Sequence, residues 1–140
     1  MQKGFTLLEV MVVLFILVIL AGLAVGLFRG QQQKAQRDST VVYVKMLANA
    51  IDLYEQNVSR APTTEQGLNA LVAAPADLAN PAKWAGPYLK DTAQTTDPWG
   101  NPYQYVAPSQ RKPGNAYDVW SYGPDGIDGT DDDIGQWTND

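Results

Sequence analysis

An uninterrupted apolar run near the N-terminus constrains this chain more than any other feature of its sequence. The run from Phe5 to Phe28 has 24 residues, and Glu9 is the one charged residue within it. As a helix rising 1.5 Å per residue it would span about 36 Å, against about 30 Å for the hydrocarbon core of a bilayer. A short core helix or an amphipathic surface helix is not apolar on every face over such a length. The run therefore predicts a membrane-crossing helix.

Composition narrows what the remaining residues can do. The chain has 140 residues, which suits one domain, and from Arg29 onward it becomes polar, rich in Gly and Pro, and increasingly acidic. It contains no cysteine and no histidine, which excludes disulfides, Cys- or His-based metal sites and the Ser-His-Asp triad. A net charge of −5 argues against nucleic acid as a partner. An enzyme that uses only carboxylates stays open.

Two polar features interrupt the apolar run. A carboxylate deep in a bilayer costs about 2.5–3.5 kcal/mol, so Glu9 needs a reason to be there. It could complete a capping box with Thr6, three residues earlier, or it could meet a cation on a neighbouring chain. Gly22, Gly26 and Gly30 recur every fourth residue, a spacing that lets helix backbones approach closely. Glycine is also simply common in membrane helices, so helix packing is an expectation for these three positions.

The residues around the start of the run resemble a known processing signal. They read Gly4-Phe5-Thr6-Leu7-Leu8-Glu9-Val10 after a basic leader, which resembles the class III signal of type IV pilins and type II secretion pseudopilins. The resemblance implies that a prepilin peptidase cleaves between Gly4 and Phe5, removes residues 1–4 as a leader and methylates Phe5. It also implies that Glu9 pairs with the Phe5 amine of an adjacent subunit during assembly.

The rest of the chain predicts an α+β fold. Apolar residues recur at steps of three and four from residue 31 to residue 58, which predicts one continuous helix from about Phe5 to about Val58. Its first half would lie in lipid and its second half would be amphipathic, through Tyr43, Leu47, Ile51, Tyr54 and Val58.

Shorter elements follow this helix. The Thr63–Gln66 spacing predicts a capping box before a short helix. Alternating aromatic and branched residues predict strands over 103–106 and 117–121, with turn chemistry at Pro113-Gly114-Asn115 between them. We therefore expect a long N-terminal helix packed on a small antiparallel sheet.

Acidic residues gather at the C-terminal end. Residues 118–140 hold seven Asp and no Lys or Arg, and the carboxylates alternate with glycines. Clustered carboxylates repel one another unless a cation joins them, and calcium takes six to eight oxygens in flexible geometry. The spacing does not fit an EF-hand, and the strict octahedral demand of magnesium suits the segment less well. The sequence favours a calcium site here over a solvated acidic tail.

Three blocks in this second part resemble a narrower family, the major pseudopilins of the type II secretion system. They are Ala61 to Leu68, Asp97 to Tyr103, and Ser121 to Trp137. Type IV pilins proper usually close this region with a disulfide, whereas this chain has no cysteine and has an acidic loop there. The resemblance to major pseudopilins implies that this loop binds calcium. By position its ligands would be Asp125, Asp132 and Asp133 with the carbonyls of Tyr122 and Thr130, and Asp131 competes for a place among them.

The same resemblance implies a function, a location and partners. Residues 1–4 would be the leader, 5–28 the transmembrane and filament-core helix, and 29–140 a periplasmic domain that includes the rest of the helix. The chain would cross the bacterial inner membrane once and polymerise into a periplasmic pseudopilus that helps drive folded proteins through an outer-membrane secretin. Its partners would be further copies of itself, minor pseudopilins, the prepilin peptidase, the inner-membrane assembly platform and the secretion ATPase. The alternatives are a type IV pilus subunit for adhesion or DNA uptake, and a membrane-anchored calcium-dependent hydrolase.

Overall fold

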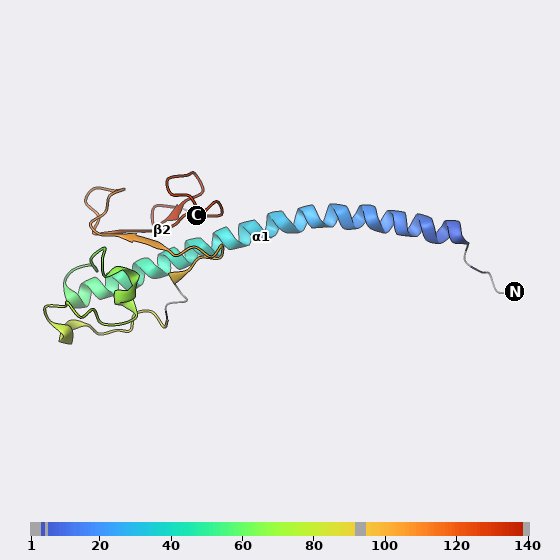
Figure 1. The fold of residues 1–140 in the computed structure, drawn as a ribbon. Helices are drawn as coiled ribbons and strands as arrows, with labels where there is room; N and C mark the ends of the chain where they lie inside the picture. Colours follow the sequence, from blue (N-terminus) through green and yellow to red (C-terminus); the bar gives the residue numbers. More distant parts are fainter. Residues whose placement is uncertain (1–3, 5, 92–94, 139–140) are drawn as a thin grey trace. The chain divides into compact units, whose positions relative to one another are not determined.

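The computed structural model describes residues 4, 6–91 and 95–138, and residues 24–29 by their backbone alone (Figure 1). In chain order its elements are α1 (Leu7–Val58), the 3₁₀ helices η1 (Gly67–Leu71) and η2 (Pro81–Lys83), and the strands β1 (Gln104–Val106), β2 (Asp118–Ser121) and β3 (Ile134–Gly135). The chain divides into two compact units, Met1–Gln36 and Arg37–Asp140, so α1 contributes residues to both.

Helix α1 begins and ends at residues that satisfy its exposed backbone groups. The Thr6 hydroxyl oxygen accepts a hydrogen bond from the backbone N–H of Glu9 at 3.2 Å, which makes Thr6 the N-cap. At the other end Ser59 has a φ of +69°, and its N–H donates to the carbonyl four residues earlier at 2.7 Å. A left-handed residue directly after the last turn is a common helix stop. The predicted continuous helix is confirmed over the described residues, with Leu7 and Val58 as its ends.

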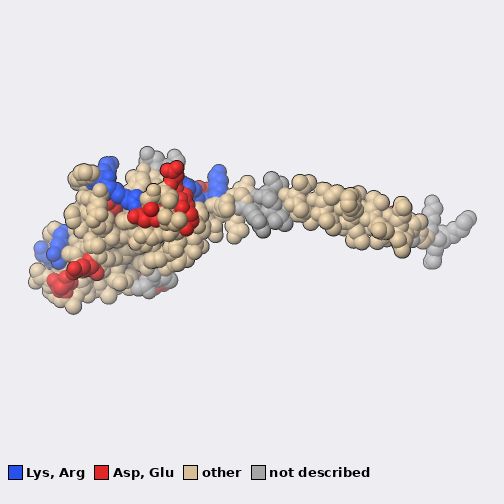
Figure 2. Space-filling view, turned by 45° about the horizontal axis from the view of Figure 1, so that its top comes forward, with Lys and Arg blue, Asp and Glu red and all other residues tan. Residues whose placement is uncertain are grey.

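The first unit exposes an apolar helical surface. Each large apolar side chain between Leu7 and Leu20, and that of Leu23, is at least 47 % exposed. On the face drawn in Figure 2 this part of the helix presents no charged side chain. Within the described part of the chain, no helix has the combination of length and hydropathy expected of a membrane-crossing segment. The predicted crossing segment, 5–28, includes Phe5 and the side chains of residues 24–28, which lie outside the described residues.

In the second unit, the C-terminal part of α1 supplies one side of the core. Leu47, Ile51 and Tyr54 are fully buried, as their helical spacing predicts. Tyr43, expected on the same apolar stripe, is instead 43 % exposed, and that expectation was wrong. Val44, which is 1 % exposed, continues the three-and-four spacing of the buried residues and leaves Tyr43 at the edge of the face.

The other side of the core comes from the loops and the sheet. These elements bury Leu68, Leu71, Leu78, Leu89, Tyr103, Tyr117, Val119 and Ile134 against the helix. Two tyrosine hydroxyls tie the sheet to the helix and to its exit. The hydroxyl of Tyr117 donates to Asp52 Oδ1 at 2.7 Å, and that of Tyr105 donates to the Pro62 carbonyl at 2.7 Å. The small sheet is thus fixed to the C-terminal part of α1, as Figure 1 shows.

The sheet is antiparallel, in the order β1-β2-β3. Tyr105 pairs with Val119 between β1 and β2, and Ser121 pairs with Ile134 between β2 and β3. Both predicted strands are confirmed to within one residue, and the turn between them forms with Gly114 at a φ of +97°. The sequence did not predict β3, because a strand of two residues carries no alternating pattern. All four residues of the central strand, β2, are buried.

The capping box predicted at Thr63 is present with both of its bonds. The Gln66 N–H donates to the Thr63 hydroxyl oxygen at 3.2 Å, and the Thr63 N–H donates to Gln66 Oε1 at 3.0 Å. This reciprocal pair is the arrangement that the spacing predicts. The helix that follows is the short 3₁₀ helix η1, which buries Leu68 and Leu71.

Candidate functional site

The N-terminal motif leaves its polar groups open to other molecules. Gly4 is exposed, and a Cβ placed on it would meet no atom within 4 Å. Phe5, the expected site of methylation, lies outside the described residues. Glu9 is exposed, and its carboxylate has no partner among the described residues; its backbone N–H alone takes part in the cap. The capping bond from Thr6 is therefore present, and pairing of the Glu9 carboxylate with a neighbouring subunit stays a prediction.

The space beside two of the three predicted helix-packing glycines is open within the described part of the chain. A Cβ on Gly22 or on Gly30 would have no atom within 4 Å. The surroundings of Gly26 lie outside the described residues. Their role in packing against other copies stays a prediction.

The segment between β2 and β3, residues 122–133, is referred to below as the acidic loop. Asp97, 5 % exposed, anchors its base by accepting a hydrogen bond from the Ser121 hydroxyl at 2.6 Å and two more from backbone N–H groups of its own turn. Gly123 has a φ of +72°, and a Cβ on it would run into the carbonyl of Asp132. Only glycine fits there, so the two ends of the loop can lie against each other.

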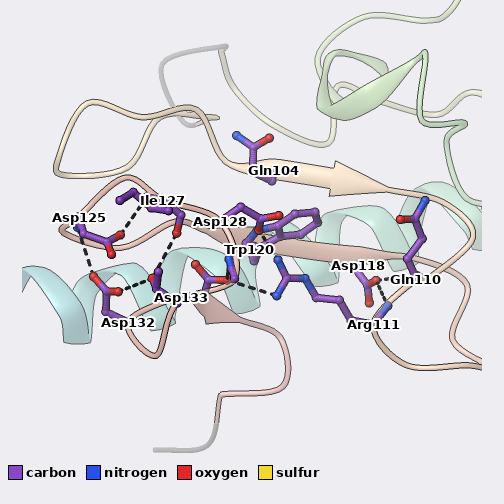
Figure 3. A network of polar contacts seen from close by, with 12 residues as sticks. Gln104, Gln110, Arg111, Asp118, Trp120, Asp125, Ile127, Asp128, Asp132 and Asp133 are labelled. Carbon is purple, nitrogen blue, oxygen red and sulfur yellow. Dashed lines mark hydrogen bonds and ion pairs between the residues drawn. The ribbon is translucent and has the colours of Figure 1, made fainter.

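Three of the predicted calcium ligands form one hydrogen-bonded group. Asp132 Oδ1 accepts from the Thr130 hydroxyl at 2.5 Å, and Oδ2 accepts from the Asp125 N–H at 3.2 Å. The Thr130 bond is the main reason that the pKa of Asp132 lies below its ordinary value. Asp125 Oδ1 accepts from the Ile127 N–H at 2.9 Å, a local turn bond. Figure 3 shows Asp125 and Asp132 together at one end of the loop.

Asp133 and Asp128 are bound by a cation that the sequence argument missed. The Arg111 guanidinium donates through Nη1 to Asp133 Oδ2 at 3.2 Å and through Nη2 to Asp128 Oδ1 (Figure 3). Asp133 Oδ2 also accepts from the Gly129 N–H at 3.0 Å. Arg111 precedes the acidic segment, so counting charges within residues 118–140 could not find it. The available signal was the basic pair Arg111-Lys112 in the connection that precedes β2.

The remaining predicted ligands differ in their surroundings. Tyr122 is half-buried, with its ring edge-on to Trp120 at 6.4 Å, and burial raises the pKa of its hydroxyl. Asp131 is exposed.

The acidic loop has features that suit a metal ion, although no metal cluster is preformed in it. Among the described residues, no three acidic side chains lie close enough together to hold a metal. Asp133 Oδ1 is nevertheless buried and has no hydrogen-bond partner among the described residues. A buried acceptor oxygen without a donor is costly unless something else satisfies it. Carboxylate oxygen is the kind of donor that calcium takes, so this oxygen fits a calcium ligand.

Known proteins match both parts of the chain. Residues 28–137 match the type II secretion system protein G family, and residues 1–25 match the prokaryotic N-terminal methylation motif. The type II secretion system core protein G of Aeromonas hydrophila is 49 % identical over 137 residues, covering 97 % of this chain and 92 % of that protein. The protein of the same name from Klebsiella pneumoniae is 45 % identical over 138 residues, covering 98 % and 95 %.

A solved structure is similar as well. The crystal structure of the major pseudopilin from the type 2 secretion system of enterohaemorrhagic Escherichia coli matches with a TM-score of 0.64 and 38 % identity. The match covers 79 % of this chain and 94 % of that one.

A methylation motif at the start of a long helix, with a small antiparallel sheet on the helix's C-terminal part, defines a type IV pilin-like subunit. The chain belongs to the type II secretion system protein G family, the major pseudopilins. It is a structural subunit of the pseudopilus and not an enzyme, and it acts in a membrane-anchored periplasmic filament. The family does not support the alternatives of a type IV pilus subunit or a calcium-dependent hydrolase.

Proposed function

We propose that a prepilin peptidase cleaves this chain between Gly4 and Phe5 and methylates Phe5, and that the mature chain polymerises from the inner membrane into the pseudopilus. The second unit lies in the periplasm. Minor pseudopilins, the inner-membrane assembly platform and the secretion ATPase take part in assembly. The growing filament helps to drive folded proteins through the outer-membrane secretin.

One observation carries this proposal: the exposed apolar part of α1 lies within the residues that match the methylation motif, 1–25, and directly follows the Gly4-Phe5 junction. Its large side chains, from Leu7 to Leu20 and at Leu23, are at least 47 % exposed in the single chain. Soluble monomers rarely expose so extended an apolar surface, because leaving it in water is unfavourable. Lipid covers this surface before assembly, and the same segments of other copies cover it in the filament. Gly22, Gly26 and Gly30 let neighbouring helices approach closely.

Glu9 gives the assembly its register. Within an apolar filament core an unpaired carboxylate is unfavourable, and a cation at the matching position of the next subunit relieves the cost. Cleavage after Gly4 creates such a cation, the amine of Phe5. The absence of a partner for the Glu9 carboxylate among the described residues supports this pairing between subunits.

Calcium completes the acidic loop. The residues that would hold it are Asp125, Asp132 and Asp133 with the carbonyls of Tyr122 and Thr130. When bound, the ion supplies positive charge to carboxylates that otherwise repel one another. The unpartnered buried oxygen of Asp133 supports this assignment.

The test replaces Glu9 by alanine in cells that assemble the pseudopilus. We expect normal cleavage and membrane insertion, because neither step needs the carboxylate, and loss of filaments, because the register is lost. Glu65→Ala is the matched control, since Glu65 is an exposed glutamate of the second unit. Filaments of normal yield from the Glu9 variant would mean that Glu9 acts only at the helix cap and does not pair between subunits. Failure of the same variant to be cleaved would contradict the separation of processing from assembly.

A further inference from the structure

A small pocket lies beside the C-terminal end of α1, and it is referred to below as the distal pocket. Its volume is about 220 Å³, less than the roughly 300–1,000 Å³ of a typical small-molecule site, so it suits one protruding side chain. Half of its lining is apolar and half is polar. The apolar residues are Val58, Leu78 and Ala79, and the polar residues are Arg60, Asn80 and Lys83.

Hydrogen bonds fix the loop that carries one side of the distal pocket. Asn80 caps the 3₁₀ helix η2, because its side chain accepts from the Ala82 N–H at 3.1 Å. Directly after η2, the Trp84 indole N–H donates to the Ala70 carbonyl at 2.9 Å. These bonds hold the backbone on both sides of Lys83. The distal pocket is therefore a defined feature of the folded chain.

Two cations of the distal pocket lack a partner. Arg60 and Lys83 are exposed, and neither forms an ion pair within the described part of the chain. The whole chain carries a net charge of −5, so two basic side chains at one small pocket stand out. Apolar surface favours an aliphatic occupant, and unpaired cations favour a negative one. The best occupant is thus an aliphatic side chain with carboxylates beside it.

The acidic loop carries such a side chain. Ile127 is 60 % exposed, the most exposed large apolar residue outside α1 among the described residues. It lies between Asp125 and Asp128, and its N–H donates to Asp125 Oδ1 at 2.9 Å. The loop has five aspartates and no basic residue. It therefore stays acidic when one divalent cation and Arg111 are set against these charges, and its attraction to the distal pocket does not depend on an empty metal site.

The loop and the distal pocket lie at opposite ends of the second unit. Figure 1 shows residues 78–83, in yellow-green, beside the C-terminal end of α1, and residues 122–133, in red, toward the end of the unit where the helix enters it. One copy cannot fill its own pocket with its own loop, whereas a second copy can. A contact between two different surfaces of identical chains is heterologous, and it continues into a helical filament when the rotation between copies does not close a ring.

We propose that Ile127 of one copy inserts into the distal pocket of a neighbouring copy in the pseudopilus, with the carboxylates of the acidic loop facing Arg60 and Lys83. The inference rests on the proposed polymerisation and identifies surfaces through which the second units meet. Every copy carries both halves of the contact, so the contact repeats along the filament.

The test is disulfide cross-linking of the full-length chain in cells that assemble the pseudopilus. The chain has no cysteine, so Ala79→Cys together with Ile127→Cys introduces the only thiols. With copper phenanthroline as the oxidant, we expect a ladder of disulfide-linked multimers on non-reducing gels, because each copy carries both thiols. Either single variant should give no ladder beyond a dimer.

Ala73→Cys with Ile127→Cys is the matched control. Ala73 is an exposed alanine earlier in the same connection and does not line the distal pocket. We expect no ladder from this pair, and a ladder as strong as that of the Ala79 pair would overturn the proposal. Filaments of the Ala79 pair without a ladder would also overturn it and leave polymerisation standing. Absence of filaments from wild type, seen by electron microscopy, would instead contradict the proposed function.

A charge reversal covers the case in which the Ala79 pair does not assemble. Lys83→Glu places a negative charge where the acidic loop of the neighbour arrives, so filament yield should fall by about tenfold or more. Its melting temperature should match that of wild type, because the side chain is exposed. Lys112→Glu makes the same reversal at an exposed lysine outside the pocket and should assemble normally. Equal filament yields from the two variants would overturn the proposal.

Discussion

The guanidinium of Arg111 and the carboxylate of Asp133 meet at 3.2 Å across 22 residues of sequence. Strand β2 lies between them in the chain, and the pairing joins the loop that precedes this strand to the loop that follows it. It explains how a segment rich in Asp, without Lys or Arg of its own, can pack against the sheet. The sequence indicates that clustered carboxylates need a cation. It did not indicate that Arg111 supplies positive charge to two of them.

The first prediction concerns processing. Gly4→Leu should leave the chain uncleaved, because the peptidase has to accept the residue before the cut and a bulky side chain would block it. The change should leave the fold intact, since a Cβ on Gly4 would meet nothing within 4 Å. Mass spectrometry of the membrane-extracted chain gives its N-terminus. Gln2→Leu is the control, and a mature form of normal length from the Gly4 variant would contradict the reading.

The second prediction concerns calcium. A ligand that binds only the folded form stabilises it by RT ln(1 + [L]/Kd), about 2.7 kcal/mol at a hundred times Kd. A fragment begun near Arg29 contains the whole second unit and should therefore melt several degrees higher in millimolar calcium than in chelator. Magnesium should substitute poorly, because it demands octahedral geometry. Calorimetry in the three buffers is the measurement, and equal melting temperatures in calcium and chelator would remove the metal site.

The third prediction concerns which aspartates bind calcium. Asp125→Ala should abolish the calcium-dependent rise in melting temperature while leaving the helix formed. Asp131→Ala, a neighbouring change at an exposed carboxylate, should retain the rise if Asp132 and not Asp131 is the ligand. Calorimetric titration of both variants checks this. Loss of the rise in the Asp131 variant alone would move the ligand set by one residue.

The fourth prediction concerns the helical side of the core. Ile51→Ala should lower the free energy of unfolding of the same fragment by about 2–5 kcal/mol, because this side chain is fully buried and truncation leaves a cavity. Leu53→Ala makes a similar truncation on the same helix at a side chain that is 52 % exposed, and should cost about 1 kcal/mol or less. Urea unfolding gives both values. Equal losses would mean that the buried face of α1 has been misassigned.

The fifth prediction concerns alkaline pH. Burial, with the hydrogen bond to Asp52 as the next cause, raises the pKa of Tyr117 above its ordinary value of 10.0. A raised pKa in the folded state means that the contribution is fully present below pH 10 and is lost as the pH rises toward the folded-state pKa. Tyr117→Phe should therefore be less stable at neutral pH and lose stability less steeply above pH 10 than wild type. Unfolding free energies across this range test it, with the exposed Tyr43→Phe as control, and parallel curves for wild type and the Tyr117 variant would contradict it.

Local sequence was a good guide to the elements. The capping signal at Thr63 forms both bonds that its spacing predicts, and the signal at Thr6 forms the bond to the Thr6 hydroxyl, because capping joins residues three positions apart. Both longer strands were found within a residue, since alternation is visible in a few consecutive positions. Strand β3 was not predicted, because its two residues carry no alternating pattern. They form a strand only through their pairing with β2.

The sequence alone determined the long helix, the processing motif and the family, because each rests on residues that are consecutive or regularly spaced along the chain. The tertiary structure decided which residues become neighbours from distant positions. It buries Val44 and leaves Tyr43 exposed. In the acidic loop it pairs Asp133 with Arg111, and it joins Asp125 to Asp132 at the other end. The reason is physical: a charge pair depends on distance in space, and the turn held by Asp118 sets that distance for Arg111.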